Sequence, residues 1–552
     1  MIKLPIEYNQ KSKELDDSLI KELELKETID KSNGSSVYES IFIKKTVKFD
    51  KEMYSIDGQV KHITTDKSFL KSTQSLLKSL QNIDDINCVN YEEYYKTWNE
   101  FKKEDGFKEK YLFIDWSFAE RWNHEPLFLQ IISIYNILSP LTSLLVPFIL
   151  LLIPFIIIHF KGYELSVQEY VGLLKKIFAN HTLGKLFDLQ NSEGTNKYYI
   201  LFVLFFYFMN IYQSILTCVR FYYNHDKIHR FLKTSCEYLD KTKENMQLMK
   251  NSMNANIDGY RQFIEDLESK YAQIDALSVL LKTSIKNKIH SWGYFYNIGT
   301  TLKLFYELHE ADQYKELMEY TLGFNNYYFQ MLNISDKLKK SVLGLAKFGK
   351  NNKVVAKNIH YPVHNHKQVV KNSVKIDKNV IITGPNASGK TTMIKSILIN
   401  LILSQQIGCG YYDKLEFQPY DYFYSYINIP DTLGRDSLFQ AEARRCKFIL
   451  DNIEKKGRHF CIFDELFSGT NIEDAINSAK SFIHLLVCNK NLRFILTTHF
   501  NELCKISNIK NMRMIVDDNY DPTYVIKDGI NTVKCVSKIF KELDYPDNFF
   551  IR

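Results

Sequence analysis

The residues I-I-T-G-P-N-A-S-G-K-T-T, from Ile381 to Thr392, decide the fold of the C-terminal part of this chain. An apolar strand leads into this segment and a helix follows it, so backbone N–H groups and the positive helix end can surround a phosphate. Gly384 and Gly389 permit tight turns that a Cβ would obstruct. The segment is therefore predicted to be a phosphate-binding loop.

Two further apolar segments end in polar side chains. F-C-I-F-D-E runs from Phe460 to Glu465, and F-I-L-T-T-H-F runs from Phe494 to Phe500. Each is predicted to be a buried strand whose polar, potentially catalytic side chains follow at the carboxyl end. The order of loop, paired carboxylates and histidine is typical of an ABC-type ATPase, so we expect an α/β P-loop domain that uses ATP and Mg²⁺.

The chemistry of ATP hydrolysis assigns a role to each of these residues. Lys390 should reach the β- and γ-phosphates, while Thr391 and Asp464 should hold Mg²⁺. Glu465 should polarise the attacking water, and His499 should sense the γ-phosphate. The nucleotide-binding residues predicted from the loop are Gly384, Pro385, Asn386, Ala387, Ser388, Gly389, Lys390, Thr391 and Thr392.

The spelling of these motifs resembles the ATPase of the MutS mismatch-repair family. G-P-N-A-S-G-K-T-T is closer to that family than to transporter ATPases, and the likeness continues in I-H-Y-P-V, V-V-K-N-S-V and D-S-L-F-Q-A-E-A-R-R. F-S-G-T-N, after Glu465, is similar to the shortened MutS-like proteins. The resemblance covers roughly residues 350–552. It implies that Ser437 caps the γ-phosphate of a partner subunit, that the chain forms a homodimer, and that DNA is a partner.

The chain departs from the mismatch-reading members of that family. Residues 1–125 contain no G-x-F-Y-E wedge, and Phe305-Tyr306-Glu307 lacks the preceding glycine, so we interpret it as coincidence. The chain also ends where a C-terminal helix-turn-helix would begin. Direct mismatch recognition by this chain alone is therefore not expected.

Two segments have the composition of membrane spans. Residues 137–160 and 198–219 are apolar, contain no Asp, Glu, Lys or Arg, and are long enough to cross a bilayer. Pro140, Pro147 and Pro154 should kink the first. Such a hairpin places the N-terminus and the ATPase together on the cytosolic side of a membrane, with lipid as a partner. A buried hairpin of a soluble protein is the alternative, and the orientation of residues 161–197 stays open.

The remaining sequence sets the domain organisation. The chain has 552 residues and a net charge of +7, which permits a nucleic-acid partner without demanding one. We expect an N-terminal mixed or helical region at 1–125, a two-span membrane hairpin at 126–220, a helical lever-like region at 221–349 and the ATPase at 350–552. A fragment that begins near Lys350 is expected to be soluble.

Three classes of function fit these patterns. The first is a membrane-anchored MutS-like ATPase that couples an ATP-driven dimer cycle to binding of mismatched or branched DNA. The second is a membrane transport or remodelling ATPase without DNA binding. The intact Lys390, Asp464, Glu465 and His499 argue against the third, an inactive scaffold.

Overall fold

The computed structural model describes most of the chain. The described residues are 2–28, 35–42, 61–83, 89–161, 166–180, 195–253, 259–285, 292–362, 369–427, 429, 438–518 and 521–533. They form two compact units. The sheet unit comprises residues 1–88, 244–271 and 319–552, and the helical unit comprises residues 89–243 and 272–318.

A six-stranded sheet forms the centre of the sheet unit. Its strand order is β13-β12-β6-β11-β10-β9, and neighbouring strands run parallel except for the antiparallel pair β12 and β13. The bounds are β6 Asn379–Thr383, β9 Tyr422–Tyr426, β10 His459–Asp464, β11 Leu492–Thr498, β12 Ile509–Val516 and β13 Pro522–Asp528. Every residue of β6 is buried, as expected for a central strand covered on both faces.

Three helices belong to this sheet. They are α13 Lys390–Ile407, α14 Leu438–Ile453 and α15 Ile472–Cys488, and the short helix η5 covers Asn501–Lys505. Buried residues of α14 recur at Glu442, Cys446, Ile449 and Ile453, which is one helical face. That face and α15 pack with strand residues such as Phe463 and Leu496 into one apolar core.

A second sheet of five strands has the order β5-β4-β8-β3-β7. Its strands are β3 Gly344–Phe348, β4 Val354–Ile359, β5 Asn372–Ile376, β7 Cys409–Gly410 and β8 Lys414–Phe417. In β5 burial alternates along the strand, so one face packs inward and the other faces outward.

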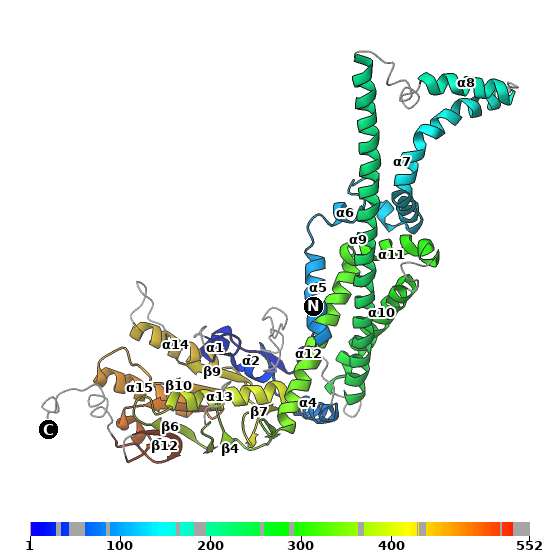
Figure 1. The fold of residues 1–552 in the computed structure, drawn as a ribbon. Helices are drawn as coiled ribbons and strands as arrows, with labels where there is room; N and C mark the ends of the chain where they lie inside the picture. The colour runs from blue at the N-terminus through cyan, green and yellow to red at the C-terminus, as the bar shows by residue number, and fades with distance from the viewer. Residues whose placement is uncertain are drawn as a thin grey trace. The chain divides into compact units, whose positions relative to one another are not determined.

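Residues from the N-terminus complete the sheet unit. The elements are η1 Pro5–Tyr8, β1 Ser12–Glu14, α1 Asp17–Glu22, α2 Val37–Phe42, β2 His62–Thr64, α4 Lys67–Ser79 and η2 Leu80–Asn82. Strands β1 and β2 pair with each other, α1 contacts β9, and β2 and α4 contact α13 (Figure 1). Because α13 is covered by these elements as well as by the sheet, nearly all its side chains are buried.

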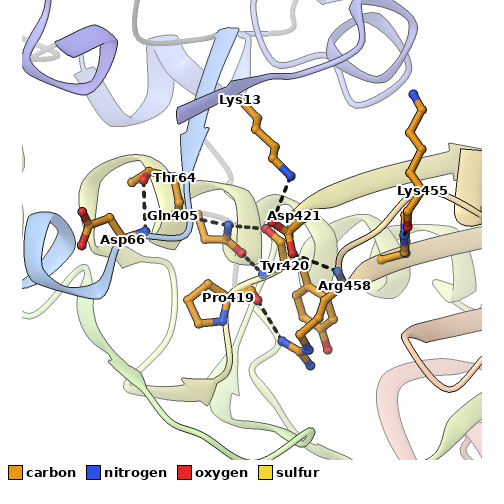
Figure 2. A network of polar contacts seen from close by, with 10 residues as sticks. Lys13, Thr64, Asp66, Gln405, Pro419, Tyr420, Asp421, Lys455 and Arg458 are labelled. Carbon is orange, nitrogen blue, oxygen red and sulfur yellow. Dashed lines mark hydrogen bonds and ion pairs between the residues drawn. The ribbon is translucent and has the colours of Figure 1, made fainter. Parts of the chain in front are cut away.

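Polar bonds join the N-terminal residues to the sheet (Figure 2). Gln405 donates from Nε2 to the carbonyl oxygens of Thr64 at 3.2 Å and Tyr420 at 2.8 Å, and its Oε1 accepts from the backbone N–H of Tyr420 at 2.8 Å. Lys13 donates to Asp421 Oδ1 at 3.0 Å, and Asp421 Oδ2 accepts from the backbone N–H of Arg458 at 2.9 Å. The N-terminus is thus part of the same core as the sheet.

The helical unit is built almost entirely from helices. Its elements are α5 Val89–Lys102, α6 Phe107–Lys110, η3 Glu120–His124, α7 Pro126–Phe160, α8 Val167–Asn180 and α11 Trp292–Glu310. Three long helices have residues in both units, namely α9 Thr195–Met253, α10 Arg261–Ile285 and α12 Asp312–Lys339. Phe305 and Tyr306 are each 1% exposed and pack in an aromatic core with Phe107, so the F-Y-E tripeptide is core structure here.

Two helices in the described residues are long and apolar enough to cross a membrane, judged by length and composition alone. They lie within α7 and α9, which contain the predicted spans, and α7 continues through all three prolines and curves along its length in Figure 1. In the α9 candidate none of the most apolar window is buried.

Candidate functional site

The carboxyl ends of three adjacent parallel strands bring the predicted residues together. In the register of the sheet Thr383 lies opposite Thr498, and Thr497 lies opposite Asp464. The loop after β6, the carboxylates after β10 and the histidine after β11 therefore emerge side by side. This edge of a parallel sheet is where ligands bind in α/β proteins.

The loop between β6 and α13 has the backbone conformation of an anion cradle. Gly389 caps α13 with φ 89°, and Ala387 has φ 57°, so both lie in the left-handed region. A Cβ on Gly384 would lie 2.8 Å from Ser388 Oγ and 3.0 Å from Met514 Cβ. Ser388 is buried and donates to the carbonyl oxygen of Pro385 at 2.8 Å, which closes the loop on itself.

Lys390 crosses this loop with its ammonium group buried. Its side chain is 5% exposed, and Nζ donates to the carbonyl oxygens of Gly384 and Pro385, each at 3.1 Å. Burial lowers the pKa of Lys390, while Glu465, 3.5 Å from Nζ, opposes that shift. A cation held among carbonyl oxygens at a helix N-terminus suits a polyanionic ligand.

Asp464 binds two hydroxyl groups from the neighbouring elements. Its Oδ2 accepts from Thr391 Oγ1 at 2.7 Å, and its Oδ1 accepts a short bond from Thr497 Oγ1. The Thr391 hydroxyl and the Asp464 carboxylate thus lie in direct contact, and their predicted role at Mg²⁺ stays a prediction. Oxygen ligands of this kind, next to a phosphate cradle, fit Mg²⁺.

Glu465 and His499 form a direct pair. His499 Nε2 lies 2.7 Å from Glu465 Oε1 and 3.2 Å from Lys390 Nζ. Because a single ring nitrogen cannot both donate to the carboxylate and accept from the ammonium, we assign its proton to the shorter contact. This hydrogen bond, with Lys390 nearby, lowers the pKa of Glu465. A carboxylate that stays ionised can act as a base toward water.

A cavity of about 240 Å³ opens beside the loop. Its lining includes Gly389 and Thr392 from the loop and helix start, together with His360, Tyr361, Val369, Val370, Met514 and Tyr524. Aromatic and branched apolar side chains next to a phosphate cradle suit a planar base. This cavity was not predicted from the sequence, although Val369 and Val370 begin the segment V-V-K-N-S-V that resembles the MutS family.

The structure thus gathers Lys390, Thr391, Asp464, Glu465 and His499 at one edge of the sheet. Ser437 lies outside the described residues, so its predicted role stays a prediction. Two residues that support the site were not predicted. Glu442 binds the loop that follows Glu465, and Thr497 donates to the Asp464 carboxylate. The hydroxyl in T-T-H was a visible signal for Thr497.

Comparisons with known proteins match the part of the chain that contains this site. Residues 380–537 match the family model of MutS domain V. A DNA mismatch repair protein MutS from Staphylococcus haemolyticus is 25% identical over 220 residues, which is 37% of this chain and 25% of that protein. An endonuclease MutS2 from Ligilactobacillus salivarius is 28% identical over 39% of this chain and 29% of its own length. The human MutS protein homolog 4 is 32% identical over 25% of this chain and 15% of its own.

The fold and the site define an α/β domain whose loop, hydroxyl, carboxylates and histidine meet at the carboxyl edge of a parallel sheet. Residues 380–537 are similar to MutS domain V, and the matched relatives are MutS, MutS2 and MutS-homologue proteins. The matched part spans less than a third of the length of these relatives. The likeness therefore concerns this domain.

Proposed function

We propose that this protein is a Mg²⁺-dependent ATPase whose site lies at the carboxyl edge of the six-stranded sheet. The observation that carries the proposal is the convergence of Lys390 with the Thr391–Asp464 pair and the Glu465–His499 pair around one glycine-rich loop. The adjacent cavity, lined by Val369, Val370 and Tyr524, would accept the adenine base.

Each residue has a defined task in this proposal. Backbone N–H groups of residues 386–391 and the Lys390 ammonium bind the phosphates, and an incoming phosphate competes with Glu465 for that ammonium. Thr391 and Asp464 hold Mg²⁺, which neutralises charge on the phosphate oxygens. Released from Lys390, the Glu465 carboxylate accepts a proton from water, while His499 keeps that carboxylate oriented.

The direct test compares Mg²⁺-dependent ATP hydrolysis by the full chain and by Lys390→Ala. Removing the charge should abolish nucleotide binding, because the remaining loop N–H groups are neutral. Lys505→Ala is the matched control, because Lys505 is an exposed lysine on η5. Hydrolysis by Lys390→Ala at the rate of the unmodified protein would refute the proposed site.

We further propose that the chain is anchored in a membrane by α7 and α9. The two helices contact each other through small polar groups: the hydroxyls of Ser143 and Ser214 lie 2.6 Å apart, and Tyr207 donates to the carbonyl oxygen of Leu144 at 3.1 Å. Large apolar side chains such as Phe202 and Phe205, each 60% exposed, remain available to lipid.

The sheet unit constrains how such an anchor could cross. Residues before 89 and after 318 share one core, so they lie on the same side of any membrane. The chain between them must then cross an even number of times, as a hairpin of α7 and α9 would. ATP would locate that side in the cytosol.

Two candidates remain for the action that ATP drives. The likeness of residues 380–537 to MutS domain V supports DNA as the partner, with two copies of the chain completing each ATP site. The second candidate is a membrane-remodelling ATPase that uses the same exposed apolar helices. Gel shifts of the detergent-purified protein across homoduplex, mismatched and branched DNA, with and without ATP, separate them. Salt-sensitive binding supports the first, and no binding to any DNA supports the second.

A further inference from the structure

The loop that follows Glu465 is held by a buried carboxylate from α14. Glu442 is 2% exposed. Its Oε1 accepts from the backbone N–H of Ser468 at 3.0 Å and from the Ser468 hydroxyl at 2.9 Å, and its Oε2 accepts from the backbone N–H of Gly469 at 3.2 Å. A carboxylate only accepts hydrogen bonds, so these three donors are a matched set of partners for a buried acid.

The backbone of this loop needs such support. Glu465 has φ 52° and Phe467 has φ 58°, and side-chain-bearing residues keep this left-handed conformation only where their surroundings hold it. On one side the Glu465 N–H donates to the carbonyl oxygen of Thr497 at 3.1 Å. On the other side Glu442 holds Ser468 and Gly469, which lie three and four residues beyond Glu465.

Helix α14, which carries Glu442, is itself fastened to the sheet unit. Arg445 donates from Nη2 to Glu22 Oε1 at 3.1 Å and to the carbonyl oxygen of Ser425 at 2.9 Å. Ser425 also donates to Glu22 Oε2 at 2.5 Å. Burial raises the pKa of Glu22, and Arg445 opposes that shift. One turn of α14 therefore links α1, β9 and the loop after Glu465.

We propose that Glu442 is a positioning residue for Glu465. This role rests on the proposed ATPase function. Glu442 fixes the direction of the Glu465 carboxylate through the loop and does not touch the nucleotide. A displacement of α14 would then turn Glu465 away from its water. The position of α14 thereby controls the hydrolysis step and leaves nucleotide binding alone.

Ser468→Ala and Glu442→Gln test this role. Ser468 is exposed, so its substitution removes one of the three bonds without leaving a cavity. We expect kcat for ATP hydrolysis to fall about tenfold in Ser468→Ala. The fall should be larger in Glu442→Gln, because the new side-chain NH₂ group would face a backbone N–H and could not accept its hydrogen bond. KM and the affinity for a fluorescent ATP analogue should change by less than about twofold. Glu454→Gln, at an exposed carboxylate just beyond α14, is the matched control and should leave kcat unchanged.

A double-mutant cycle separates positioning from general loss of structure. If Ser468 and Glu442 act through Glu465, Ser468→Ala should cost nothing further in single-turnover hydrolysis by the Glu465→Gln protein. A tenfold loss in both backgrounds would overturn the proposal, and so would an unchanged kcat in Ser468→Ala and Glu442→Gln. Absence of hydrolysis by the unmodified protein would instead refute the ATPase function itself.

Discussion

Gln405→Leu should destabilise the sheet unit while leaving the ATP site chemically intact. Gln405 is fully buried on α13, and leucine has nearly the same volume. The substitution removes the partner of three buried backbone groups, which are the N–H and carbonyl of Tyr420 and the carbonyl of Thr64. An unpaired buried group costs about 1–3 kcal/mol, so we expect a total loss of about 3 kcal/mol.

The assay is thermal unfolding of the detergent-purified full chain, followed by intrinsic fluorescence. For a unit of several hundred residues, about 3 kcal/mol corresponds to a decrease in Tm of about 4 °C. Proteolysis within residues 2–83 should also accelerate, because Gln405 bonds to β2. Gln273→Leu is the control, since Gln273 is exposed on α10 and its substitution should cost less than about 0.5 kcal/mol. A Tm within 1 °C of the unmodified protein would show that these bonds contribute nothing.

Four further outcomes test the site and the proposed anchor. Glu465→Gln should retain ATP affinity and hydrolyse at least about a hundredfold more slowly, so that bound ATP survives gel filtration; rapid turnover by this variant would remove Glu465 from the role of base. The His499 hydrogen bond lowers the pKa of Glu465, so that carboxylate stays ionised as the pH falls. In His499→Ala the pKa of Glu465 should rise, and the acidic limb of the pH–rate profile should move to higher pH. An unmoved limb would contradict this pairing. Ser437→Ala and Lys390→Ala, each nearly inactive, should regain partial activity when mixed if each ATP site needs two chains, whereas a monomer with no rescue would refute the dimer. Full-length protein should remain with membranes after alkaline carbonate extraction, and its recovery in the soluble fraction would favour a buried hairpin.

The placement of the candidate site residues along one sheet edge was predictable because its signals are local. Lys390, Asp464, Glu465 and His499 each stand at the end of an apolar strand or at the start of a helix, and parallel strands bring such ends together. Glu442 was not predicted, because an acidic residue in a helix gives no indication that it is buried against a loop more than twenty residues later. The apolar cavity lining was missed for a similar reason, since Val369, Met514 and Tyr524 come from distant segments.

The N-terminal residues were the least predictable part of the fold. Strands β1 and β2 have three residues each, too few for a periodic pattern, yet they and α4 help to enclose α13. The structure therefore changes one expectation. A fragment that begins near Lys350 would leave this side of α13 uncovered, including Gln405 and the Gln406 amide that accepts from Tyr38, so we expect it to aggregate.

The contacts between residues 13–22 and residues 421–445 have a consequence for biosynthesis. Lys13 bonds to Asp421, 408 residues later, and Glu22 bonds to Arg445, 423 residues later. At about 5–20 residues per second, a ribosome needs roughly 20–80 s to supply these partners. During that interval Leu19, Tyr38 and Ile41, all buried in the finished protein, have no core to enter. These residues are thus translated well before their folding partners, and a chaperone that shields them in the interval would raise the yield of folded protein.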